Sequence, residues 1–168
     1  MTPSEQAAPP AVAPERDPRE VHLLGRTVPR ASRAERVAAL IVAAGALLVL
    51  AIALRLDPDP RGVGTHEQLG LPPCGLVAQW GIPCPSCGFT TTFCLAAHGR
   101  VLAAARNQPF GLLLFGLTIA AVPLGLLGAF RGVSWLLLMD RLRLGRIALI
   151  ALGLWLASWL YKWWMVVS

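Results

Sequence analysis

The stretch "VAALIVAAGALLVLAIAL", Val37 to Leu54, contains eighteen residues and no charged side chain. As an α-helix it would be about 27 Å long, close to the hydrocarbon thickness of a bilayer at roughly 30 Å. Arg55 follows it and can extend its guanidinium toward the lipid headgroups. We therefore predict a membrane-spanning helix over residues 37–55.

Two later stretches share this length and apolar character. The first, "PFGLLLFGLTIAAVPLGLLGAF", covers residues 109–130, and the second, "IALIALGLWLASWLYKWWMVV", covers residues 147–167. Aromatic residues crowd the end of the second, namely Trp159, Tyr161, Trp163 and Trp164. This pattern is typical of an aromatic belt at the membrane boundary, where Lys162 would be an interfacial anchor. Only 14% of the residues are charged, against about 25% in soluble domains. The predicted fold is an all-α integral membrane protein with three transmembrane helices.

The residues ahead of the first apolar stretch have a different composition. Residues 1–36 combine several prolines with scattered charges and have no apolar period, which is typical of a disordered segment. The apolar stretch begins too late for a secretory signal peptide, and no small-residue cleavage site follows it, so we expect no cleavable leader. We predict a disordered cytoplasmic tail over residues 1–36 and a single membrane domain over residues 37–168.

Arginine residues indicate how the spans are oriented. The segment before the first span carries Arg16, Arg19, Arg26, Arg30, Arg33 and Arg36, and the loop between the second and third spans carries Arg131, Arg141, Arg143 and Arg146. Only Arg61, Arg100 and Arg106 lie between the first two spans. By the positive-inside rule, the N-terminus is cytoplasmic, and the cysteine segment and the C-terminus are extracytoplasmic. The expected location is the cell membrane, as a multi-pass protein.

The net charge of +6 does not predict nucleic-acid binding, because no basic stripe alternates with aromatic residues. The predicted partner is the lipid bilayer, while a membrane-protein partner and a homo-oligomer both stay open.

Residues 134–146, "SWLLLMDRLRLGR", are expected to form an interfacial helix along the inner membrane surface.

Three of the four cysteines lie within residues 80–100, "WGIPCPSCGFTTTFCLAAHGR". Cys84-Pro85-Ser86-Cys87-Gly88 forms a C-P-x-C-G knuckle, in which proline and glycine favour a tight turn that aims both sulfur atoms to one side. Such a turn suits metal binding by thiolates or dithiol–disulfide exchange. Cys74 precedes Cys84 by ten residues, and a loop of that length can bring it to the knuckle.

The apolar pattern after the knuckle predicts a helix from Phe89, a break at His98-Gly99 and a second short helix. Residues 74–108 would then form a cysteine knuckle and helical hairpin, of which residues 80–106 rest on the membrane or re-enter it. On a continuous helix, Cys94 would rise roughly 10 Å from Cys87, whereas the ligand atoms of one zinc ion lie about 4 Å apart. Cys94 and His98 are therefore secondary candidates, for a separate half-site or for a site with Cys74.

The sequence leaves the chemistry of Cys74, Cys84 and Cys87 open. They can be disulfide staples in an oxidising compartment, zinc ligands, a redox pair with Cys84 attacking and Cys87 resolving, or small residues of a buried turn. Zinc is the one cofactor that the pattern suggests. No nucleophile with a partner base and no phosphate-binding loop is visible, so we expect no enzyme active site. We favour a structural or accessory membrane protein, in which a disulfide or a metal ion on these cysteines acts as a clip that locks the loop onto the second span.

The segment resembles a family of small bacterial integral membrane proteins classed as a domain of unknown function. The hallmarks of that family are an upstream cysteine, C-P-x-C-G-x-T-R, H-G and an N-P that opens a transmembrane helix. The matching residues are Cys74, Cys84, Pro85, Cys87, Gly88, Thr90, His98, Gly99, Gln108 and Pro109. Gln108 stands where asparagine is common, Thr91 stands where arginine is usual, and Cys94 is an addition. The resemblance implies this membrane topology over roughly residues 70–130 and brings no activity, substrate or cofactor.

Overall fold

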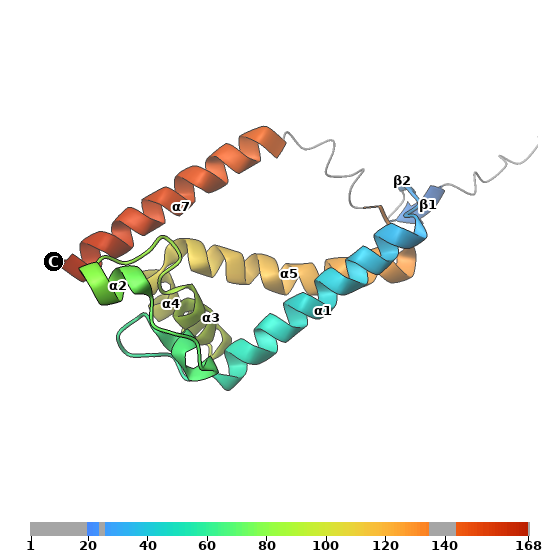
Figure 1. Ribbon diagram of the computed structural model, residues 1–168. Helices are drawn as coiled ribbons and strands as arrows, with labels where there is room; N and C mark the ends of the chain where they lie inside the picture. Colours follow the sequence, from blue (N-terminus) through green and yellow to red (C-terminus); the bar gives the residue numbers. More distant parts are fainter. Residues whose placement is uncertain (1–19, 24–25, 135–143, 168) are drawn as a thin grey trace, which may run out of the picture.

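The computed structural model of the protein describes residues 20–23, 26–134 and 144–167, and three long helices dominate it (Figure 1). They are α1 (Arg33–Arg55), α5 (Pro109–Arg131) and α7 (Leu144–Val167). All three are long and apolar enough to cross a membrane. The predicted helical membrane fold is therefore confirmed, and the predicted spans agree with these helices within four residues at each end.

The first helix begins before the predicted span because Ser32 caps it. The Ser32 hydroxyl accepts a hydrogen bond from the backbone amide of Glu35, and the Glu35 carboxylate accepts one from the amide of Ser32. This reciprocal capping box satisfies two amides that a helix start leaves without partners. The charged turn that follows Ser32 thus belongs to α1.

Part of the range predicted as a tail has secondary structure. Strands β1 (Glu20–Leu23) and β2 (Arg26–Pro29) pair antiparallel, with Val21 opposite Val28. Valine and threonine in this stretch favour extended backbone. Residues 1–19 of the predicted tail, and residues 135–143 of the predicted interfacial helix, lie outside the described residues.

Helices α1 and α5 form an antiparallel pair with close backbone contact (Figure 1). A Cβ atom placed on Gly125 would lie 2.7 Å from the carbonyl oxygen of Ala39 and 2.9 Å from the Cβ of Ala43. At the end of this pair near β1 and β2, Arg36 Nε donates to the carbonyl oxygen of Ala129 over 2.6 Å. Small residues at the crossing point allow this approach, as in many membrane helix pairs.

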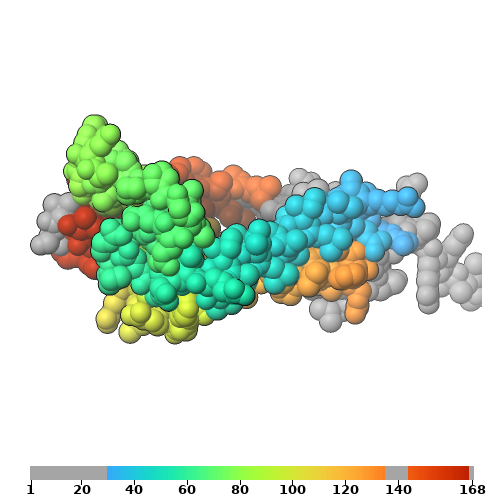
Figure 2. Space-filling view, turned by 60° about the horizontal axis from the view of Figure 1, so that its bottom comes forward, coloured from blue at the N-terminus to red at the C-terminus, as the bar shows by residue number. Residues whose placement is uncertain are grey.

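The segment between α1 and α5 folds into short helices at the opposite end of the molecule. They are the 3-10 helix η1 (Thr65–Leu69), α2 (Gly75–Trp80), α3 (Phe89–Ala97) and α4 (Val101–Asn107). The predicted break at His98-Gly99 is confirmed, and Gly99 takes a positive φ of 75° there. Figure 2 shows α2 projecting from the end of the molecule at which α7 also ends.

Helix α7 meets the rest of the protein mainly through its C-terminal half and diverges from α5 elsewhere (Figure 1). Four side chains between residues 158 and 162 hold it there by polar contacts. Ser158 Oγ donates to Gln108 Oε1, Trp159 Nε1 to the Pro83 carbonyl, Tyr161 Oη to the Arg106 carbonyl, and Lys162 Nζ to Asn107 Oδ1. Lys162 is 5% exposed, so it packs against this segment, whereas the sequence suggested an anchor at the membrane boundary.

Candidate metal centre

Three of the four thiols gather at one point of the segment between α1 and α5. The sulfur atoms of Cys74, Cys84 and Cys87 all lie within 4.8 Å of one another. The Cys84 and Cys87 sulfur atoms are 3.1 Å apart. Cys87 is buried, while Cys74 and Cys84 are partly exposed. The sequence motif and the ten-residue loop before it therefore converge in space.

The knuckle holds its two sulfur atoms by backbone hydrogen bonds. The amide of Cys87 donates to the carbonyl of Cys84 over 2.9 Å, which closes the turn. The amide of Cys84 in turn points to the Cys87 sulfur at 3.2 Å. Gly88 ends the turn with φ of 89°, and a Cβ atom there would lie 2.9 Å from the Gly62 carbonyl oxygen. Only glycine fits this position without strain, which explains the glycine of the motif.

Cys74 reaches the knuckle from the start of α2, where it is the N-cap residue. The backbone amide of Val77, with help from the neighbouring thiols, lowers the pKa of Cys74 to about 7. Burial has the opposite effect on Cys87, whose pKa lies well above the usual range of a thiol. Cys74 thus becomes a thiolate more readily than Cys87 in the metal-free protein.

A cavity of about 530 Å³ adjoins the three thiols. Its lining also includes Arg61, His66, Glu67, Thr90 and Thr91. The Arg61 guanidinium is held by the carboxylates of Asp59 and Glu67, at 2.7 and 3.2 Å. His66 Nε2 donates to the carbonyl of Pro72 over 3.2 Å. Sequence reasoning gave His66 no role, because it lies eight residues before Cys74 in a stretch without a motif.

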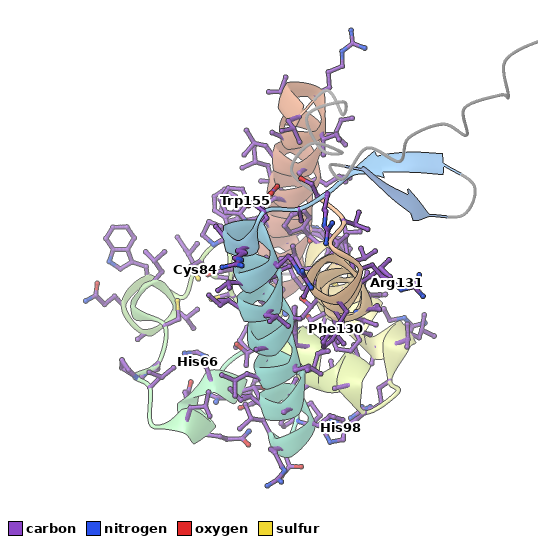
Figure 3. All side chains as sticks on the ribbon, turned by 90° about the vertical axis from the view of Figure 1, so that its right-hand side faces the viewer. His66, Cys84, His98, Phe130, Arg131 and Trp155 are labelled. Atoms are coloured by element: carbon purple, nitrogen blue, oxygen red, sulfur yellow. The ribbon has the colours of Figure 1, made fainter. Side chains whose placement is uncertain are left out.

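The structure does not bring the two secondary candidates to this point. Helix α3 continues without a break from Phe89 to Ala97, so Cys94 lies two turns beyond the knuckle. Cys94 is fully buried against Ala53 and Leu56, and burial raises its pKa to about 11. His98 ends the same helix, bonds to the Cys94 carbonyl at 2.8 Å, and lies apart from Cys84 and His66 (Figure 3).

The remaining motif residues support the segment or its junction with α5. Thr91 is buried and forms a 2.8 Å hydroxyl–hydroxyl hydrogen bond with Thr65 of η1. Gln108 is fully buried at the N-cap of α5, and Pro109 occupies the first helical position. Thr91 thus joins α3 to η1 by a neutral contact.

The donor set fits a soft or borderline divalent metal ion. Tetrahedral zinc bound at about 2.3 Å requires sulfur atoms roughly 4 Å apart, and the three thiols lie within 4.8 Å of one another. Backbone amides directed at the sulfur atoms of Cys74 and Cys87 stabilise the thiolate forms that bind metals. The same spacing permits a disulfide between any two of the three after a small sulfur movement.

Comparison with known proteins places one family on this segment. Residues 74–122 match the family described as "Protein of unknown function (DUF2752)". The matched part begins at Cys74, contains the knuckle and the α3–α4 hairpin, and ends within α5. Neither a curated protein nor a solved structure shows significant similarity to the chain.

Proposed function

We propose that this membrane protein holds a zinc ion on Cys74, Cys84 and Cys87, and that the ion is a structural clip for the segment between the first two spans. The observation that carries the proposal is the convergence of three sulfur atoms within 4.8 Å of one another. A disulfide uses two sulfur atoms and gives no role to the third, whereas a zinc ion uses all three.

The clip is needed because α2 has little else to hold it. None of the six residues of α2, all of them described, is buried, and Trp80 at its end is 70% exposed. A short helix without a buried face cannot be stable through hydrophobic packing. Cys74 lies directly before α2, so a bond from its sulfur to a metal shared with Cys84 and Cys87 would fix this helix against the knuckle.

We also propose that the zinc site lies outside the cytoplasm. In support, the segments richest in arginine adjoin the start of α1 and the end of α5, and the amide of Ala31 donates to the carbonyl of Gly132 there. The short helices of the segment that carries the thiols lie at the opposite end of the α1–α5 pair (Figure 1). The positive-inside rule assigns the arginine end to the cytoplasm, and the thiol end then faces the other side.

Elemental analysis of the full-length protein in detergent micelles tests the clip. We expect about one equivalent of zinc in the wild-type protein and a loss of most of it in Cys74→Ser, Cys84→Ser and Cys87→Ser. Cys94→Ser is the matched control, since its sulfur lies outside the cluster, and it should retain the metal. Wild-type protein with less than about 0.2 equivalents after incubation with zinc under reducing conditions would overturn the proposal.

The same samples separate the alternatives that the sequence left open. A mass two hydrogen atoms below that of the reduced chain, together with absence of metal, would indicate a disulfide staple. A mixed disulfide with another protein, trapped by Cys87→Ser through Cys84, would indicate a membrane thiol oxidoreductase.

Labelling of whole cells tests the orientation. An impermeant maleimide should label the metal-free, reduced thiols in whole cells, and labelling only after lysis would contradict the assigned side.

A further inference from the structure

Lys162 is the only lysine of the chain, and its side chain lies beside Gly88 of the cysteine knuckle. Its side chain comes from the last third of α7 and is 5% exposed. Its Nζ donates to the carbonyl oxygen of Gly62 over 3.2 Å and to Asn107 Oδ1 over 2.7 Å. Both acceptors are neutral, and no carboxylate of the described residues forms an ion pair with Lys162. A buried ammonium in such surroundings requires a compensating negative charge.

The cysteine cluster is a source of negative charge beside this lysine. Gly88 directly follows Cys87, and a Cβ atom on Gly88 would lie 3.4 Å from Lys162 Cε and 3.1 Å from Asn107 Nδ2. Asn107 also donates to the carbonyl of Gly88 at 3.1 Å, so its amide joins the lysine to the knuckle. These contacts place the ammonium beside Gly88, the residue that directly follows Cys87.

The charges of a loaded site match this arrangement. Three thiolates and one divalent cation carry a net charge of −1 when the fourth ligand is neutral, such as water or the imidazole of His66. A single ammonium group cancels that charge. In a partly buried site the effective dielectric constant is far below that of water, so the attraction between the two charges is stronger than on a surface.

We propose that Lys162 is the counter-ion of the metal–thiolate cluster and thereby couples metal binding to the docking of the third span. This inference rests on the proposed zinc site. Because the coupling is reciprocal, a bound metal favours the position of α7 in which Lys162 lies under the knuckle, and a docked α7 favours the loaded site. Lys162 is a positioning residue here, since its hydrogen bonds go to Gly62 and Asn107, which adjoin the ligand-bearing turn.

Zinc affinity of full-length variants in detergent micelles, measured by competition with a chelator of known affinity, tests the inference. Lys162→Gln keeps hydrogen-bond donors for Gly62 and Asn107 but removes the charge, and we expect at least about tenfold weaker zinc binding. Lys162→Arg keeps the charge and should bind within about threefold of the wild type. Lys162→Met supplies a second uncharged side chain if the glutamine variant aggregates.

Tyr161→Phe is the matched control, because it removes one neutral contact of the same helix, the hydrogen bond to the Arg106 carbonyl. A merely structural role of Lys162 predicts similar losses for Tyr161→Phe, Lys162→Arg and Lys162→Gln. Equal zinc affinity of the wild type and Lys162→Gln, with normal binding by the wild type, would overturn this inference alone. A wild-type protein that binds no zinc would overturn the proposed zinc site as well.

Discussion

Helix α5 is held by its two neighbouring long helices in different ways. Against α1 it makes close contacts near Gly125, whose missing side chain lets the backbone of Ala39 approach. Against α7 it makes few contacts, and these lie near its own start, where Ser158 Oγ accepts from the amide of Phe110 and donates to Gln108. One interface depends on small residues along the helices, and the other depends on polar side chains at one end.

This difference follows from what surrounds the helices. Lipid is as apolar as leucine, so apolar helices associate through close backbone approach or through hydrogen bonds between them. The α1–α5 pair uses the first means and should be stable without the cysteine segment. Helix α7 uses the second, and its acceptors on Pro83, Arg106 and Asn107 belong to the segment that carries the thiols. The position of α7 therefore depends on how well that segment is folded.

The largest expected effect is at the α1–α5 crossing. Gly125→Leu would place a side chain where a Cβ atom is already 2.7 Å from the Ala39 carbonyl oxygen. We expect a loss of about 3 kcal/mol in the free energy of unfolding, measured by denaturant titration in mixed micelles. Gly116→Leu on the same helix is the control, because nothing lies within 4 Å of its Cβ position. Equal losses for the two variants would contradict the assigned interface.

A smaller effect is expected where α7 meets α5. Ser158→Ala would leave the Phe110 amide and the buried Gln108 Oε1 without their shared partner. The expected loss is about 2 kcal/mol, again read from unfolding in mixed micelles. Thr118→Ala also deletes a hydroxyl from a long helix, but that hydroxyl bonds only to Leu114 of its own helix. If both variants lost the same stability, the polar docking of α7 would be wrong.

Cys74, at the start of α2, and Cys94, buried beside α1, differ in their thiol pKa. The nearby Val77 amide lowers the pKa of Cys74 to about 7, whereas burial raises that of Cys94 to about 11. Since only the thiolate reacts, alkylation of Cys74 in the metal-free, reduced protein should become about tenfold faster between pH 6 and pH 8. Mass spectrometry of the peptides gives both rates, and Cys94 should stay nearly unreacted. Faster labelling of Cys94 would contradict these surroundings.

The three spans could be predicted from the sequence because an uncharged run of about twenty residues has few other structures available to it. The apolar run places the start of α1 too late, because the charged first turn has the composition of the tail, although Ser32 and Glu35 have the spacing of a capping box. Strands β1 and β2 were missed because a few extended residues between charges give no clear period. The short helices η1 and α2 likewise have too few residues for a periodic pattern.

The candidate site was predictable in its motif and less so in its surroundings. Loop length suggested that Cys74 could reach Cys84 and Cys87, and helix geometry separated Cys94 from them; the function of these residues stays a prediction. Two other features depend on long-range packing that no local pattern records. These are His66 beside the cavity and Lys162 beneath the knuckle, the latter more than seventy residues after Cys87.

X-ray absorption at the zinc edge of the purified, zinc-loaded protein tests the central claim most directly, because it reads the atoms bound to the metal. The account predicts three sulfur neighbours at about 2.3 Å in the wild type and in Cys94→Ser, and two for the small fraction of zinc that Cys74→Ser still binds. A first shell made only of nitrogen and oxygen, or one unchanged by Cys74→Ser, would contradict the claim that these thiols form one metal centre.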